Sequence, residues 1–588
     1  MHEKRPQLTF KQSIEVIKRL IQFAKPFKWQ FLMSLILSLV LAAINMGLPI
    51  IIQRYIDDYL TPGQATIKIS VWFAIAYMVG NLLKMLAQYY ERYIFTVASA
   101  QTVRYIRNQL FEKINTLSMS FFDQTPTGKI ISRLTNDTQT INEFWSVFLA
   151  LIEGILSMIA AGIAMYTLNP TITLYFLIFA PLIAGVIGLY QKKSSLFYRR
   201  MRENLSQVNA QLNEAISGMP IIQMFHQENR MNETFNETNQ AFYVSNLRLV
   251  KLNSLLLMPV IHFLRALATA LVLALFSVQA LNEPLDVGII YAFTMYIANF
   301  FSPMGMMMNN LSVYQDGIVS GTRIIQLLDH EQTAPEQMNQ PIEISEGRIE
   351  FKNVSFSYDG EVDVLKNISF TVEPGETVAL VGQTGSGKSS IINLFMRFYE
   401  FDRGDILIDG QSIKDYPLEE LRHKVGLVLQ DSFLFYGDIK QNIALLKEDM
   451  SLEEIKQAAE YVNASHFIER LEDQYDSKVL ERGSSYSSGE RQLISFARTI
   501  ARHPKILVMD EATANIDTET EMIIQDSLKS MRQNRTTIAI AHRLSTISDA
   551  NQILVLDHGE IIERGTHDEL LQQQGVYAQM YQVQGQSQ

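Results

Sequence analysis

The sequence predicts two consecutive domains of different class: an α-helical domain with six membrane spans, then an α/β domain of the P-loop class. Three observations carry this prediction. Long apolar runs dominate from Trp29 to about Met308. Short β-branched runs alternate with helical segments from Glu343 onward, and one of them leads directly into a glycine-rich loop. The 588 residues are 47% hydrophobic, which is near the soluble average because the two halves differ in opposite directions.

Cysteine content and net charge exclude several classes of function. The chain has no cysteine, so disulfides, thiol nucleophiles, iron–sulfur clusters and cysteine-ligated zinc are excluded. Fifty Lys and Arg stand against 61 Asp and Glu, a formal charge of −11. This balance gives no reason to expect a nucleic acid partner.

Six segments are apolar over the roughly 20 residues that a membrane span needs. The stretch Ser13–Phe27, before the first of them, is expected to form an amphipathic interfacial helix. Two long basic segments, after the second and the fourth spans, are expected to be helical continuations of the spans, because structureless loops of that length are uncommon. The expected spans are Trp29–Ile52, Ile69–Tyr90, Trp145–Leu168, Thr171–Tyr190, Leu255–Leu281 and Val287–Met308.

Lys and Arg set the expected orientation of the spans. They gather before the first span and in the two long basic segments, whereas the other connections are short and less basic. Basic segments stay on the cytoplasmic side. The sequence therefore predicts a multi-pass protein of the plasma membrane with both termini in the cytoplasm. The first apolar run starts too late and is too long for a cleavable signal peptide, and no organelle transit signal is present, which favours a bacterial membrane.

A polar linker divides the chain. We expect a transmembrane domain over residues 1–328, a linker over 329–345 and the α/β domain over 346–588. In the α/β domain, strands are predicted at seven β-branched runs, and the helical segments between several of them favour a parallel sheet. These runs are Ile349–Phe356, Ile368–Val372, Thr377–Val381, Ile406–Ile408, Ile506–Met509, Thr536–Ile540 and Ile553–Leu556.

The most specific motif is VALVGQTGSGKSS, which has the spacing G-x-x-x-x-G-K-S/T at Gly382, Gly387, Lys388 and Ser389. Its glycines let backbone N–H groups wrap phosphates, its lysine reaches the β- and γ-phosphates, and its serine hydroxyl ligates Mg²⁺. A helix N-terminus behind the loop adds a favourable dipole. Because a strand is predicted before the loop and a helix after it, we expect nucleotide binding.

A second motif, KILVMDEATANID, follows an apolar strand. Asp510 suits coordination of Mg²⁺ through water, and Glu511 suits polarisation of the attacking water. The alternative is that the two carboxylates only cap the next helix. The phosphate loop in the same domain favours the catalytic interpretation.

Together these motifs give the chain a specific resemblance. From about Gly347 to the end it resembles the nucleotide-binding domain of ABC transporters, with the family's elements in their order. The N-terminal half resembles the six-helix domain of the type I exporter (type IV) fold, most closely at Phe121–Thr138 and Glu214–Glu228, which match the family's two intracellular loops.

The resemblance implies an ATP- and Mg²⁺-dependent site, with these residues. Glu511, the switch histidine His542 and the Q-loop glutamine Gln430 are the implied catalytic residues. Ser389, Gln430 and Asp510 are the implied Mg²⁺ ligands. ATP is implied to contact the aromatic Tyr358, the phosphate loop, the signature and the D-loop, namely Tyr358, Gly382, Gln383, Thr384, Gly385, Ser386, Gly387, Lys388, Ser389, Ser390, Ser487, Ser488, Gly489, Glu490 and Asp517.

The signature departs from the family pattern. Where the family usually has LSGGQ, this chain has YSSGE at 486–490, so three of five positions differ. Ser488 adds a side chain where phosphate comes close, and Glu490 adds a carboxylate near an anion, so both are expected to weaken the site that this signature completes.

The altered signature bears on the partner. In the family, heterodimeric exporters pair one competent with one degenerate site, and the chain with the catalytic glutamate commonly supplies the degenerate signature. The resemblance therefore implies that this chain is that subunit, with a different half-transporter, itself degenerate at its catalytic site, as partner. The alternative is a homodimer that tolerates YSSGE.

The function implied is ATP hydrolysis coupled to transport: efflux of hydrophobic or amphipathic compounds of the multidrug type, by a protein that contacts membrane lipids. A homodimeric lipid flippase or peptide exporter remains the alternative within the class. The six spans argue against a soluble ABC ATPase acting on DNA or ribosomes. The intact Glu511 disfavours an ATP-gated channel or sensor but leaves it as an alternative.

Ionisable residues inside spans are candidates for function. Glu153 is expected either to attract cationic substrates or to form an internal ion pair with Lys84 or Arg265. The Met- and Phe-rich end of the sixth span, FFSPMGMMMNN, is expected either to bind hydrophobic compounds or to pack against other helices.

Overall fold

The computed structural model divides into two compact units. We call them the membrane unit, Met1–Thr116 with Thr125–Glu331, and the sheet unit, Leu117–Gln124 with Gln332–Gln588. The structure describes residues 10–256, 258–281, 286–338, 340–430, 432–445, 450–510, 518–541 and 544–585.

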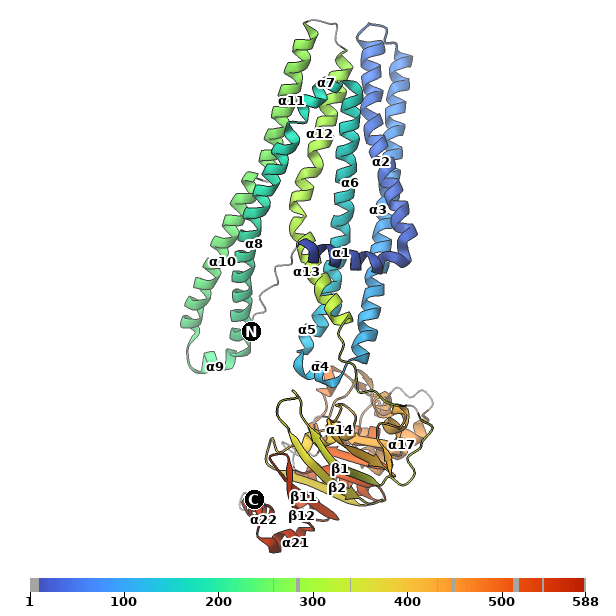
Figure 1. Cartoon of the computed structure of the whole chain (residues 1–588), viewed down its shortest axis with the longest axis vertical. Coiled ribbons are helices and arrows are strands. Elements are labelled where there is room, and N and C mark those ends of the chain that lie inside the picture. The colour runs from blue at the N-terminus through green and yellow to red at the C-terminus, as the bar shows by residue number, and fades with distance from the viewer. Residues whose placement is uncertain are drawn as a thin grey trace. The chain divides into compact units, whose positions relative to one another are not determined.

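The membrane unit is entirely helical in its described part (Figure 1). Six helical segments are long and apolar enough to cross a bilayer among the residues described, which confirms the predicted number of spans. The helices are α1 Phe10–Ala24, α2 Lys28–Tyr55, α3 Ile67–Thr116, α5 Thr127–Ser132, α6 Thr138–Leu168, α7 Pro170–Phe176, α8 Phe179–Ser217, α9 Met219–Met224, α10 Glu228–Leu256, α11 Met258–Ala280, α12 Val287–Asn309 and α13 Leu311–Leu328, with short turns of other helix types at Lys25–Phe27, Ile56–Leu60 and Arg133–Asp137.

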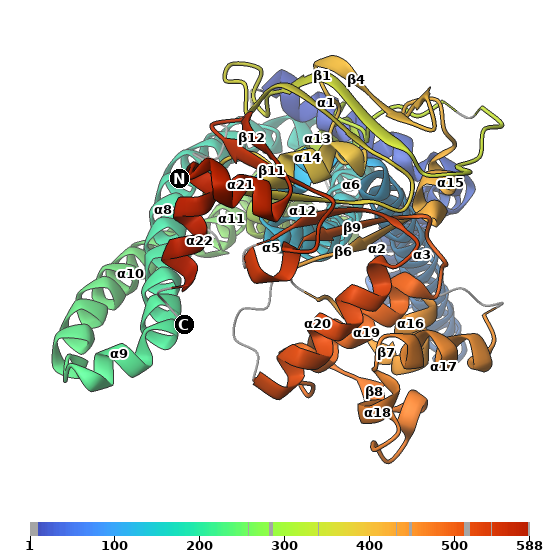
Figure 2. The same cartoon turned by 90° about the horizontal axis from the view of Figure 1, so that it is seen from below.

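Several of these helices are much longer than a bilayer is thick. The 50 residues of α3 extend about 75 Å, against about 30 Å of hydrocarbon. The 39 residues of α8 continue through the first basic residues after the fourth span. The two long basic segments are therefore helical continuations of the spans, as expected. Helices α8 and α10 lie side by side and project away from the other helices (Figures 1 and 2).

The N-terminal helix α1 crosses the bundle instead of joining it (Figure 1). Its apolar residues Val16, Leu20 and Ala24 recur every four positions and are buried. Gly321 of α13 leaves room for two of them, since a Cβ there would lie 3.0 Å from Val16 and 3.2 Å from Leu20. This arrangement agrees with the amphipathic helix predicted from the sequence.

The end of the sixth span packs within the membrane unit. Phe300, Phe301, Met304 and Met308 are buried in its core, whereas Met306 is exposed. Packing, the second of the two expectations for this stretch, accounts for the four buried residues.

The sheet unit contains a six-stranded sheet in the order β12-β11-β3-β10-β9-β6, in which only β12 is antiparallel to its neighbour. A separate antiparallel sheet has the order β2-β1-β4-β5. The strands are β1 Ile349–Phe356, β2 Leu365–Val372, β3 Thr377–Gly382, β4 Arg403–Ile408, β5 Gln411–Ser412, β6 Val425–Val428, β7 Gly437–Asp438, β8 Lys478–Val479, β9 Ile506–Asp510, β10 Thr536–Ile540, β11 Gln552–Asp557 and β12 Glu560–Gly565.

All seven predicted strands form, but three of them lie outside the parallel sheet. β1, β2 and β4 pair only with antiparallel neighbours. β1 and β2 are joined by a short connection, without the helical crossover that a parallel pair needs. The sequence reasoning also missed β6, whose four residues VGLV are too short to show a pattern.

The helices of the sheet unit pack in separate hydrophobic clusters (Figure 2). One hydrophobic cluster joins α14 to both sheets, and another joins α16, α17 and α19 to one side of β9 and β10. The helices are α4 Met119–Gln124, α14 Lys388–Phe395, α15 Leu418–Lys424, α16 Ile439–Ala444, α17 Leu452–Tyr461, α18 Ser465–Ile468, α19 Ser488–Ile500, α20 Thr518–Arg532, α21 His567–Gln573 and α22 Val576–Gly585, with 3-10 turns at Gln474–Asp476, Glu481–Gly483 and Leu544–Ile547.

Candidate functional site

The phosphate loop lies between β3 and α14, as its sequence context predicts. Gly382 has φ +152°, and a Cβ there would lie 2.3 Å from the carbonyl oxygen of Leu556. Gly387, the N-cap of α14, has φ +106° and its Cβ would lie 2.6 Å from Leu365. A side chain is therefore excluded at both glycines by space as well as by backbone conformation.

The loop forms a small cradle with polar groups inside. Lys388 is only 7% exposed, and its Nζ donates hydrogen bonds to the carbonyl oxygens of Gly382 at 2.8 Å and Gln383 at 2.9 Å. Burial lowers the pKa of Lys388, and the charge of Asp510 opposes that shift. The hydroxyl of Ser386 is buried and has no hydrogen-bond partner. An unsatisfied hydroxyl beside a buried lysine suits an anion with several oxygens.

The other loop residues border this cradle. Gln383, Thr384 and Gly385 are exposed, as is Ser389 at the first turn of α14. Ser390 is buried and shares a hydrogen bond of 3.0 Å with the hydroxyl of Tyr358. A phosphate chain bound here would be open to solvent on one side.

Tyr358 presents a half-exposed ring next to the loop. It is 45% exposed, and it makes edge-to-face contacts with Phe356 and Tyr399, at 4.6 and 5.0 Å between ring centroids. These contacts hold the ring in one orientation. An exposed aromatic face beside a phosphate cradle is the arrangement that a purine ring would stack on.

Two more predicted residues lie at the carboxyl edge of the parallel sheet. Asp510 ends β9 and is paired with Ile540 at the end of β10, and Gln430 follows β6 and is exposed. Strands β3, β9 and β6 are parallel members of one sheet, so the phosphate loop, Asp510 and Gln430 share its carboxyl edge, where open α/β sheets bind ligands. Glu511, Asp517 and His542 lie outside the described residues.

These residues fit an ATP–Mg²⁺ complex. Ser389 and Asp510 are hard oxygen donors, and Mg²⁺ takes the rest of its shell from phosphates and water. Among the described residues, no three or more His, Cys, Asp or Glu side chains gather in one place. A metal site built from protein ligands alone would need such a group. The orphaned Ser386 hydroxyl and the glycine cradle point to the same ligand.

The signature begins α19 and makes its own cap. Ser487 is the N-cap, and its hydroxyl accepts a hydrogen bond of 3.2 Å from the N–H of Glu490. The Glu490 carboxylate accepts one of 2.8 Å from the N–H of Ser487. Ser488 and Gly489 lie between them in the first turn. This reciprocal pattern is a capping box, and it occupies groups that the sequence reasoning assigned to phosphate.

The signature and the phosphate loop are not brought together within one chain. No hydrogen bond or ion pair among the described residues joins residues 487–490 to residues 382–390. The two segments belong to different hydrophobic clusters of the sheet unit.

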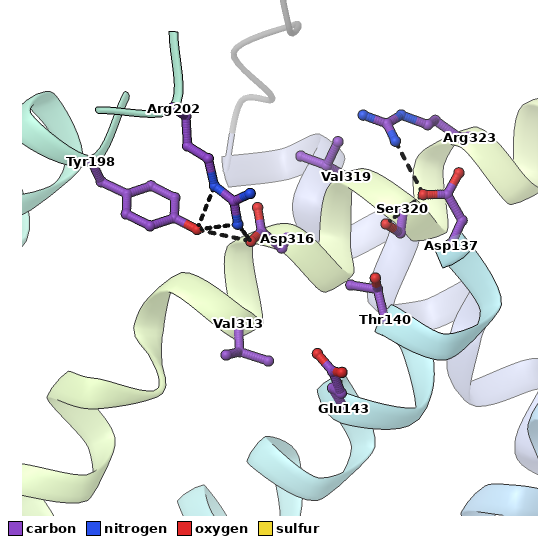
Figure 3. Close-up of a pocket in the computed structure, with 10 residues that line it drawn as sticks. All are labelled: Asp137, Thr140, Glu143, Tyr198, Arg202, Val313, Asp316, Val319, Ser320 and Arg323. Carbon is purple, nitrogen blue, oxygen red and sulfur yellow. Dashed lines mark hydrogen bonds and ion pairs between the residues drawn. The ribbon is translucent and has the colours of Figure 1, made fainter. Parts of the chain in front are cut away.

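The membrane unit has a polar pocket of about 340 Å³ (Figure 3). Tyr198 and Arg202 of α8 reach Asp316 of α13 there, with a Tyr198 hydroxyl to Asp316 distance of 3.3 Å and an Arg202–Asp316 ion pair of 3.7 Å. Asp137 accepts hydrogen bonds from Ser320 at 2.9 Å and Arg323 at 3.1 Å. One partly exposed ion pair, Arg202–Asp316, thus links α8 to α13, and such a pair is a weak interaction. A second pair, Arg323–Asp137, links the turn Arg133–Asp137 to α13.

The ion pairs considered for Glu153 do not form. In the described part of the chain, no ion pair joins Glu153 to Lys84 or Arg265. The carboxyl group of Glu153 lies instead within hydrogen-bonding reach of Glu91 on α3. The sequence reasoning missed Glu91 because the predicted span ended one residue earlier, at Tyr90.

Two family models match the chain. The model described as ABC transporter transmembrane region matches residues 31–304, and the one described as ABC transporter matches residues 365–514. Among curated proteins, a putative ABC transporter ATP-binding protein, exp8, of Streptococcus pneumoniae is 45% identical over 97% of both chains. A probable multidrug resistance ABC transporter ATP-binding/permease protein, YheH, of Bacillus subtilis is 42% identical over 86% of this chain and 76% of its own.

A solved structure shows the same architecture. The structure of a bacterial Atm1-family ABC exporter with ATP bound has a TM-score of 0.76 and 28% identity, and covers 95% of this chain and 98% of its own. In this chain, six apolar helices precede a domain that contains a phosphate loop. The sequence motifs and the structure agree on this order. This chain therefore belongs to the ABC transporter family, as an exporter half-transporter that couples ATP hydrolysis to transport across a membrane.

Proposed function

We propose that this chain is the catalytic-glutamate subunit of a heterodimeric exporter in the plasma membrane, which expels hydrophobic or amphipathic compounds. One observation carries the proposal: an open phosphate loop and a self-capped signature occur in the same chain. The phosphate loop is equipped to bind ATP. The signature is less able to bind the phosphate of an ATP held by the partner, because its capping groups already bond to each other. A partner with an ordinary signature and a degenerate catalytic site would complete one competent ATP site and one weak one.

The self-capped signature supports an asymmetric dimer. A phosphate that approaches the N-terminus of α19 meets the Glu490 carboxylate, a like charge at the end of the helix where anions normally bind. The Ser487 hydroxyl accepts the Glu490 N–H and must also turn toward the phosphate to donate. Two copies of this chain would place such a signature in both sites, which disfavours the homodimer.

Within the competent site, each residue has a proposed role. Lys388 and the loop N–H groups hold the β- and γ-phosphates, and Tyr358 supports the adenine ring. Glu511 polarises the attacking water, and His542 and Gln430 contact the γ-phosphate and its water. When bound, Mg²⁺ neutralises charge that develops on the phosphates, held through Ser389, Asp510 and Gln430. Asp517 belongs to the D-loop that faces the partner.

The sheet unit includes a segment that would pass nucleotide binding to the membrane helices. Helix α4 carries Asp123, whose carboxylate accepts a hydrogen bond from the hydroxyl of Tyr399. Burial and this hydrogen bond raise the pKa of Tyr399, which therefore stays a neutral donor. The Tyr399 ring in turn touches Tyr358. We propose that adenine bound at Tyr358 is sensed by α4 through this contact.

The proposed membrane placement rests on the distribution of basic residues, and the proposed substrate class rests on the names of relatives. Basic residues gather in the long helical continuations, which supports a cytoplasmic sheet unit and cytoplasmic termini, with a transmembrane domain at 1–328, a linker at 329–345 and a nucleotide-binding domain at 346–588. Relatives named for multidrug resistance or export support amphipathic substrates. A homodimeric lipid flippase or peptide exporter is the alternative.

The test is to purify the chain alone and together with the half-transporter encoded beside it. We expect a stable dimer and full ATP turnover only in the pair, and loss of turnover in Glu511→Gln. A chain that dimerises by itself with full, Glu511-dependent turnover would refute the heterodimer. Turnover that survives Glu511→Gln would refute the catalytic assignment. Stimulation by amphipathic cations, and not by phospholipids or peptides, would separate the substrate classes.

A further inference from the structure

Three helices of the membrane unit meet at a buried carboxyl group. Glu91 of α3 is 0% exposed. Ser38 of α2 donates a hydrogen bond to its carboxylate, and Ser34 of α2 donates one of 3.2 Å to its main-chain oxygen. Helix α6 packs against α2 and α3, and its Glu153 lies close to the Glu91 carboxyl group. The two acidic side chains therefore face each other between helices that are far apart in the sequence.

The pair lies in an apolar part of the bundle. Ser38 is about 15 Å along α2 from its first residue, Lys28, well within a hydrocarbon layer of about 30 Å. One turn from Glu91 on α3, Phe95 packs edge to face on Phe31 at 5.2 Å, and Phe31 also contacts Trp145 of α6. Such surroundings strengthen the repulsion between two ionised carboxylates.

One oxygen of each carboxyl group is buried without a donor. Glu91 Oε2 and Glu153 Oε1 have no hydrogen-bond partner, although both are inaccessible to solvent. The charges that act on Glu91 are those of Glu153 and, more weakly, of the exposed Arg92 beside it on α3. Ser38 is neutral and can donate only once. With both carboxylates ionised, these two oxygens would have no hydrogen-bond donor, and no positive charge from the described residues would lie between the carboxylates.

We propose that Glu91 and Glu153 form a proton-binding site that holds one proton between the two carboxyl groups at neutral pH. A protonated carboxyl group supplies the missing donor, and its neighbour accepts. Among the described residues, no third acidic or histidine side chain joins the two carboxylates, as a metal site built from protein ligands would require. Binding forms one O–H bond with a proton from solvent, and release returns that proton to water. No step depends on the nucleotide site or on the partner.

Release of the proton would leave two negative charges between α2, α3 and α6. We therefore expect the packing of these helices to weaken as pH rises through the release. Replacing both glutamates by glutamine removes the two titratable groups and keeps side chains of nearly the same size and shape. The proton would then link pH to the conformation of the membrane unit.

The experiment uses the full-length protein in lipid nanodiscs without nucleotide. Infrared spectroscopy at about pH 7, far above the ordinary range of a glutamate, should detect a protonated carboxyl band that shifts in D₂O. The band should be absent from the double variant Glu91→Gln/Glu153→Gln. It should persist in Glu143→Gln, which removes an exposed carboxyl group from the same helix, α6.

Absence of the band from the wild type, or its survival in the double variant, would overturn the proposal. Thermal unfolding adds a second measurement. Between about pH 6 and 9, the unfolding temperature of the wild type should fall by roughly 3 °C more than that of the double variant. Equal slopes would also contradict the proposal. Because the wild-type band is observable by itself, a double variant that fails to fold does not remove the first test.

Discussion

The phosphate loop and the signature are both turns that lead into a helix, and their helix ends differ. Helix α14 begins at Gly387, which has no side chain to cap it, so its first N–H groups remain available. Helix α19 begins at Ser487 and closes its own end with Glu490. An uncapped end costs stability but can bind an anion, whereas a capped end is stable without one. The N-terminus of α14 is therefore suited to bind an anion, whereas the N–H groups of Ser487 and Glu490 at the N-terminus of α19 are already satisfied by its own side chains.

The largest effect should follow from removing the charge inside the open loop. Lys388→Met deletes a buried ammonium group that is expected to make charge-assisted hydrogen bonds to phosphate. At about 1.5–3 kcal/mol for each such bond, ATP affinity should fall about a hundredfold. Nucleotide titration measures this loss. Because burial disfavours the charged lysine, the free variant should unfold at the same or a higher temperature. Unfolding at a much lower temperature would mean that Lys388 mainly supports the fold.

A smaller effect should follow from filling the loop. Gly382→Ala places a Cβ 2.3 Å from the Leu556 carbonyl oxygen, so stability should fall by about 3 kcal/mol and ATP affinity should fall with it, by less than in Lys388→Met. Gly385→Ala is the matched control, since its φ is also positive, at +87°, but no atom lies within 4 Å of the added Cβ. It should cost only about 1 kcal/mol, from backbone strain. Equal losses in chemical denaturation would assign the whole effect to backbone strain.

Ser386→Ala tests whether the orphaned hydroxyl is kept for the ligand. Its oxygen is buried without a partner, so removing it should leave the stability of the free protein unchanged or slightly higher. ATP affinity should nevertheless fall about tenfold, because one hydrogen bond to a charged group is lost. Calorimetric titration and thermal unfolding of the same samples give both values. A stability loss with unchanged affinity would contradict an anion-binding role.

The smallest effect should come from the signature. Glu490→Gln keeps an acceptor for the Ser487 N–H and removes the negative charge, so the affinity of the assembled dimer for a nonhydrolysable ATP analogue should rise about threefold. Glu569→Gln is the matched control, because Thr566 and Glu569 form the same capping box at α21, outside the signature. A rise in both variants, or in neither, would show that the charge of Glu490 does not oppose the nucleotide.

Much of the fold and part of the candidate site follow from local patterns. Six apolar runs of span length are visible directly, because each helix satisfies its own backbone and must be apolar throughout. The glycine spacing around Lys388 is equally local, since the loop conformation depends on adjacent residues. The strand VGLV before Gln430 carries no such pattern, because a buried strand of four residues is stabilised by its neighbour β9.

The sequence by itself determined the six spans, the phosphate loop and the altered letters of the signature, because each depends on residues that are close in the chain. The tertiary structure decided which strands form the parallel sheet. β1, β2 and β4 are β-branched runs like the parallel strands, but they pair in a separate antiparallel sheet. It also decided the partner of Glu153. A lone acidic residue in a span predicts only that some compensating group is near, and the packing of α2, α3 and α6 made that group a second carboxyl, Glu91.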